Sequence, residues 1–459
     1  MLRRKAFDDA VADDEALINL YYANFHACHP ILVPRTMYSS QHYPGYLRLV
    51  VHFIGSHFSS TMSGDSLRAA TAEALTDADQ QQGRRGYHLV QARLLFSIAL
   101  HARNEIRESV SVLAQAVALA LDLGMHRKSF CLTHGRQVSM EEESLRRTWW
   151  ELYVTDGYVA ALQRSPSFRC HSCGPDVPLP CDESLYVEGA FLMEPPTVEQ
   201  FDARVYAEEE LQFSSFCYRI EAVRILARAL SISCVHEVQE EQVQAIDNAL
   251  AAWRHNLAVG KTNIHDAFGQ VDEMLFQAHM LIQYTTIYLH FWRSELAATV
   301  PAAFDIIRER HLPPVSTRHT HGIKAIEASK QLADLAALGV PVQKHTPFFV
   351  FALVFSAIVQ LSACSLHGPD FRELYRDRLA LITGVLKTLS PNWAFAQVVV
   401  RKVKRMTADL LRARTGEGAV ESEFCQDSGV DLATPGVALR GSDFPWIDLL
   451  SWDPGAGSL

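Results

Sequence analysis

Three cysteines and a histidine in one short segment have the residue types of a zinc site. Cys170, His171 and Cys173 are followed by Cys181, which gives one Cys-x2-Cys pair and a third thiol. Structural zinc takes four ligands in a tetrahedral arrangement, and the adjacent Cys170 and His171 are poorly placed to bind the same ion. No second Cys-x2-Cys pair occurs in the sequence. We therefore interpret these thiols as packing residues and expect no metal and no cofactor in this chain.

Other candidate groups for catalysis or metal binding are isolated. The acidic run from Asp8 to Glu15 lies outside any apolar pattern, so we interpret it as solvated rather than as a magnesium site. His311, His319 and His321 are predicted to be surface residues of a loop. No phosphate-binding glycine loop, dinucleotide fingerprint or nucleophile elbow is present. We expect the chain not to be an enzyme.

Composition restricts the class of protein further. The 459 residues carry a net charge of −10, which argues against a broad phosphate-binding surface. The nine cysteines are scattered, and acidic residues follow the basic N-terminus where a signal peptide would be apolar, so we expect a reducing, intracellular environment. The segment 345–367 lacks charged residues, but serines and a glutamine interrupt it. We predict that it is a buried core helix and that the chain does not enter a membrane.

The body of the chain has the periodicity of helices. Apolar residues recur at helical spacing from about residue 15 to 414, and no alternation long enough for a sheet appears. The predicted fold is therefore all-α: a polar arm over residues 1–14, a large multi-helix domain over 15–414 and a disordered acidic tail over 415–459. We expect one helix over about 201–234, and a loose loop after a short helix start within 63–86.

The tail has its own chemistry. From residue 415 onward it has eight acidic residues and one basic residue. Its end interleaves acids with large apolar side chains, the pattern of disordered activation segments that bind a partner. The alternative is that it docks on the body of the same chain. The candidate contact residues are Phe444, Trp446, Leu449, Leu450 and Trp452.

The segment 139–166 is predicted to be a long helix. Ser139 and Glu142 have the spacing of a capping box, and Pro166 ends the pattern. Trp149 lies on one apolar face and Trp150 on a neighbouring one, so we expect burial on more than one side. The charged residues of such a helix need partners, and we expect Arg146, Arg147 and Asp156 to form buried or groove-edge pairs.

Four sequence blocks carry a resemblance to a known family. The blocks are 17–32, 87–127, 146–156 and 176–183, and their motif residues are Arg146, Arg147, Trp149, Trp150, Asp156, Pro180 and Asp182. In this order they resemble the fungal-specific transcription factor domain, the regulatory middle region of fungal binuclear zinc-cluster transcription factors. The motif residues are expected to be structural, and Gly157 departs from the arginine usual after Asp156.

The resemblance implies a nuclear regulator of a fungal metabolic gene set. It implies zinc only in the family's DNA-binding module, whose six-cysteine segment we do not find, so we expect DNA contact to be indirect or through a separate module. The tail would bind the transcription machinery or a co-activator, and a homodimer is compatible with the family. Residues 401–405 fit either a nuclear-import patch or a solvated helix face. The alternative hypothesis is a helical small-molecule-sensing module, or a co-regulator that does not bind DNA itself.

Overall fold

The computed structural model is built from helices. The described residues contain no strand, and one isolated bridge pairs His265 with Val271. This confirms the all-α prediction for the part of the chain that the structure describes. The described residues are 2–62, 64–80, 86–135, 139–191, 194–207, 211–233, 239–266, 269–299, 314–339, 341–367 and 369–415.

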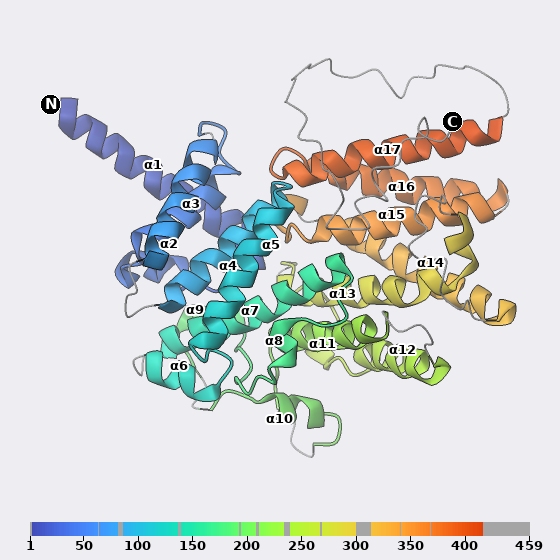
Figure 1. The fold of residues 1–459 in the computed structure, drawn as a ribbon, viewed down its shortest axis with the longest axis horizontal. Helices are drawn as coiled ribbons and strands as arrows, with labels where there is room; N and C mark the ends of the chain where they lie inside the picture. The colour runs from blue at the N-terminus through green and yellow to red at the C-terminus, as the bar shows by residue number, and fades with distance from the viewer. Residues whose placement is uncertain are drawn as a thin grey trace.

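The N-terminal half surrounds a central helix, α7 (Figure 1). Helices α4 and α5 pack on each other and on α7, while α1, α2 and α3 form the outer layer beside α4. The helices of this half are α1 (Leu2–Asn24), α2 (Gly45–Ser56), α3 (Gly64–Gln80), α4 (Gly86–Ala102), α5 (Ile106–Asp122), α6 (Lys128–His134), α7 (Ser139–Gln163), α8 (Arg169–Ser172), α9 (Glu183–Glu188) and α10 (Val198–Ala203).

The C-terminal half is a stack of long helices. Each of α13, α14, α15, α16 and α17 packs on the next, and α11 joins the stack to α7 (Figure 1). The helices are α11 (Ser215–Ser233), α12 (Glu240–His255), α13 (Glu273–His290), α14 (Val315–Ala336), α15 (Phe349–Leu366), α16 (Pro369–Leu389) and α17 (Ala394–Thr415). Short 3-10 turns lie at His26–Cys28, Arg35–Gln41, Val259–Lys261, Phe291–Arg293, Glu295–Thr299 and Val342–Lys344.

Helix α15 is long and apolar enough to cross a membrane, but it lies inside the stack. Within this helix, 83% of the residues are buried. It contacts α13, α14, α16 and α17, so its apolar side chains have protein partners on all sides. The interpretation of 345–367 as a core helix is confirmed.

Three predicted helix boundaries are wrong. Helix α1 begins at Leu2 rather than near Asp14, because no proline or glycine interrupts this segment. The region expected to be loose after residue 63 contains the regular helix α3, because its several alanines favour helix formation. The single helix expected over 201–234 is divided into α10 and α11, and Thr197 starts α10 through a capping box with Gln200.

Candidate functional site

Helix α7 is buried on several faces, as predicted. Trp149 and Trp150 are at most 1% exposed. The indole Nε1 of Trp150 donates a hydrogen bond of 2.9 Å to the carbonyl of Pro178. A buried indole that has its partner fixes the approach of two segments, and here it holds the proline-rich segment 175–196 against α7.

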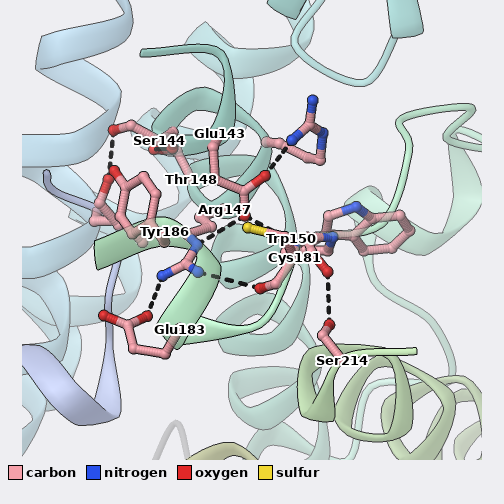
Figure 2. Close-up of polar contacts among 12 residues, drawn as sticks. Glu143, Ser144, Arg147, Thr148, Trp150, Cys181, Glu183, Tyr186 and Ser214 are labelled. Carbon is pink, nitrogen blue, oxygen red and sulfur yellow. Dashed lines mark hydrogen bonds and ion pairs between the residues drawn. The ribbon is translucent and has the colours of Figure 1, made fainter. Parts of the chain in front are cut away.

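Arg147 is the centre of the first charged cluster on α7 (Figure 2). Its guanidinium is fully buried, donates to Glu143 at 2.8 Å and to the Cys181 carbonyl at 3.1 Å, and is paired with Glu183. The ring of Tyr186 lies 3.9 Å from its Cζ atom. Burial alone would lower the pKa of Arg147, but Glu183 and Glu143 raise it above its ordinary value, so the charge is retained.

Glu143 has three partners at the same place. Its carboxylate accepts from Arg147, from Arg146 and from the backbone N–H of Cys181, the last at 3.0 Å. Two cations and an amide therefore neutralise one buried carboxylate. The cluster fixes α7 to the segment that leads into α9.

A second charged cluster lies two turns further along α7. Glu151 is 1% exposed, accepts from the His29 ring Nδ1 at 2.8 Å and is paired with Arg219 of α11. Arg219 also donates to Gln277 of α13 at 2.8 Å. Burial raises the pKa of the Glu151 carboxyl, but Arg219 and His29 lower it below its ordinary value.

The second cluster continues to the segment before α15. His29 Nε2 lies 3.2 Å from the Thr346 hydroxyl, and the adjacent His345 contacts Glu273 at 2.7 Å. The Cys28 thiol donates to the carbonyl of Lys344 at 2.6 Å. Segments more than 300 residues apart in sequence are thus joined by buried polar contacts.

With this geometry established, comparison with known proteins decides the family. The model of the fungal specific transcription factor domain matches residues 18–255, slightly more than half of the chain. The chain belongs to this family. All of α7 lies inside the matched region, whereas the second cluster also takes in residues beyond it, at Gln277 and Thr346.

A curated relative extends the likeness beyond the matched region. The chain is 28% identical over 409 residues to the C6 finger domain transcription factor iacK of Pestalotiopsis fici, covering 87% of this chain. It spans 60% of that relative's length. No solved structure matches the chain.

The motif residues shared with the fungal specific transcription factor domain divide into two places. Arg146, Arg147, Trp150 and Pro180 meet at the proline-rich segment, where the Pro180 carbonyl accepts from Ser214 at 2.6 Å. Asp156 lies three turns further along α7, accepts from the Cys170 backbone N–H at 3.0 Å, and has a pKa that burial raises.

Asp182 and Trp149 complete the motif. The Asp182 carboxylate lies 3.1 Å from the Lys261 Nζ atom. Asp182 stands in sequence between Cys181 and Glu183, which both belong to the first cluster. Trp149 packs near the ring of His126, with 5.9 Å between centroids. Most of the contacts named here join α7 to the segments packed on it.

The other residues singled out from sequence have ordinary surroundings. Cys170 and Cys181 are buried free thiols, and no three His, Cys, Asp or Glu side chains converge as metal ligands in the described ranges. On α17, Arg401, Lys404 and Arg405 are exposed while Val403 is buried. The tail residues Phe444, Trp446, Leu449, Leu450 and Trp452, and also His311, lie outside the described residues.

The prediction of a surface loop is wrong for His319 and His321, because both lie in α14, although His319 is exposed as expected. His321 belongs to α14, where its ring Nδ1 lies 2.7 Å from Nδ1 of His290. Asp247 contacts the other ring nitrogen of His290 at 3.0 Å. Burial lowers the pKa of His321 to about 4, so its ring is neutral and can share one proton with His290.

Sequence reasoning missed the acidic members of both clusters. The i, i+4 spacing of Glu143 and Arg147 is the signal that could have indicated their pair. Glu151 carries no such signal, because its partner Arg219 is 68 residues away in sequence. The two glutamates are eight residues apart, which places them on one face of α7.

Proposed function

We propose that this chain acts as a nuclear transcription regulator of a fungal metabolic gene set, without catalytic activity. Membership of the fungal specific transcription factor domain family supports transcription regulation. The helical body serves as the regulatory region, and the acidic, aromatic segment near residue 446 recruits a co-activator or the transcription machinery.

The observation that carries this proposal is the continuity of the core. Residues of the matched region contact the C-terminal stack through His29 and Thr346, and through Asn392, which donates to the His57 carbonyl at 2.9 Å. A family region that shares its core with α13–α17 forms one folded body. Such a body can transmit a binding event at α7 to the helix that precedes the tail, α17.

DNA contact belongs to a separate element in this proposal. The relative from Pestalotiopsis fici carries the words C6 finger in its name, and zinc would be bound by a module of that kind or by a partner that has one. A mobility-shift assay of this chain at physiological salt tests this point. A specific shift by the chain alone would contradict the co-regulator form of the proposal.

Activation is tested by tethering the full chain to a foreign DNA-binding module in a reporter strain. We expect reporter expression that falls to background when Trp446, Leu449, Leu450 and Trp452 are all replaced by alanine. The matched control replaces Val430 and Leu432, which lie in the same tail outside the aromatic segment, and should keep full activity. Equal activity of both variants would refute the assignment of the activation segment.

A second candidate function is small-molecule sensing by the body. It is favoured by a pocket whose lining includes Glu143 and Arg146 of the first cluster on α7. The two functions are compatible, because a ligand bound to the body can control a tail that activates.

A further inference from the structure

A pocket of about 200 Å³ lies between α6, the start of α7 and the proline-rich segment. It reaches the first charged cluster, since Glu143, Arg146 and Cys181 form part of its wall. The remaining lining residues are Lys128, Cys131, Leu132, Glu142, Pro178, Phe191, Pro195 and Pro196.

Arg146 is the unusual member of this wall. The residue is 6% exposed, and its Nη1 is paired with Glu143. Its Nε is buried and has no hydrogen-bond partner in the described part of the chain. A buried guanidinium N–H without an acceptor is unfavourable, and the planar guanidinium matches the two oxygens of a carboxylate. Because the Arg146 side chain lines the pocket, its guanidinium favours an anionic, planar acceptor there.

The other charges of the pocket permit such a ligand. Glu143 is already neutralised by Arg146, by Arg147 and by the Cys181 amide. Lys128 and Glu142 stand on the same wall and offset each other in formal charge. Arg146 is then the group whose hydrogen bonding remains incomplete.

The size and walls of the pocket define the rest of the ligand. Three prolines, Phe191 and Leu132 give flat apolar surfaces beside the arginine. An apolar cavity of about 150 Å³ holds one benzene molecule. We propose that this pocket binds a small monocarboxylate with a single apolar ring, of the size of phenylacetate. This deepens the proposed regulatory function and rests on it.

Binding here would act on the proline-rich segment. The backbone of Cys181 is held by Glu143 and Arg147 from one side of that segment, and the ligand would contact Pro178 and Pro196 from the pocket side. The carboxylate would complete the hydrogen bonding of Arg146 and hold the segment more firmly against α7.

Titration calorimetry of the full chain with phenylacetate tests the proposal. We expect saturable binding, and binding of the neutral 2-phenylacetamide that is weaker by at least about tenfold, the effect of losing one charge-assisted hydrogen bond. Arg146→Gln should weaken phenylacetate binding by a similar factor. Leu132→Trp, at a position 57% exposed and therefore tolerant of bulk, should abolish binding by filling the pocket. Arg401→Gln on α17 is the matched control and should bind normally.

Absence of saturable binding by the wild-type chain would overturn the proposal, as would unchanged binding by either pocket variant. Thermal melting of each variant checks that it folds, and Leu132→Trp tests the site without altering Arg146. Absence of phenylacetate binding by the wild-type chain, together with normal reporter activation, would overturn this inference alone. A silent reporter with intact binding would instead contradict the activation proposal.

Discussion

Removal of Arg219 is the sharpest test of the second cluster on α7. In Arg219→Met, Glu151 loses its cationic partner while it stays 1% exposed. Gln277 loses the donor that lies 2.8 Å from its side-chain oxygen. Breaking a buried ion pair by removing one partner typically costs about 3–5 kcal/mol. We expect the free energy of unfolding to fall by that amount near pH 7.

The pH dependence of the loss has a definite sign. In the native protein the pKa of Glu151 is lowered, so its contribution to stability is present above its unfolded value and is lost as the pH falls through the lowered value. Without Arg219, burial favours the protonated acid. The penalty of Arg219→Met should therefore shrink as the pH approaches the ordinary carboxyl value.

Urea titration followed by tryptophan fluorescence measures this effect. The matched control is Arg224→Met on the same helix, because Arg224 pairs with Asp202 at the surface and such pairs contribute at most about 1 kcal/mol. Adding Glu151→Gln to Arg219→Met should restore part of the stability, since the uncompensated charge is removed. A loss below about 1 kcal/mol for Arg219→Met, or no difference from the control, would refute the reasoning.

Two further predictions concern helix contacts. Gly55→Ala should destabilise the protein by about 1–3 kcal/mol, because the added Cβ would lie 2.2 Å from the Leu17 carbonyl oxygen. The control Gly45→Ala, whose added Cβ has nothing within 4 Å, should change stability by less than about 1 kcal/mol. Equal shifts of the melting temperature in the two variants would contradict this prediction. His101 is 1% exposed, and burial lowers its pKa to about 3, so the unfolded chain binds a proton that the folded chain does not between about pH 6.5 and 3. The wild type should lose about 2 kcal/mol more stability than His101→Leu between about pH 7 and 5, and parallel curves from urea titrations would contradict it.

The sequence predicts those features that depend on local periodicity. Trp149 and Trp150 lie on adjacent flanks of a helix that has few exposed positions, so their burial follows from the pattern alone. The charge-free segment 345–367 is predicted to be a core helix for the same reason. The residues that other segments contribute to each cluster have no signal in the local sequence. Arg219 and His29 belong to other segments. Only the packing of α11 and of the turn at His26–Cys28 brings them to Glu151.

The two clusters on α7 hold different parts of the molecule. In the first cluster, Glu143 holds the proline-rich segment and Arg147 holds α9. In the second cluster, Glu151 holds the turn at His29 and α11, and Arg219 extends the contacts to α13. Removing one partner from a buried cluster is costlier than replacing that partner with another of the same charge. A conformational change in this body therefore requires an exchange of partners within a cluster. Arg146 is a buried charge that lines the pocket, and its Nε has no hydrogen-bond partner in the described part of the chain. A carboxylate ligand bound there would pair with the same guanidinium while Glu143 keeps its contacts with Arg147 and the Cys181 amide. A small molecule bound in the pocket would thereby change the contacts that hold α7 against the proline-rich segment.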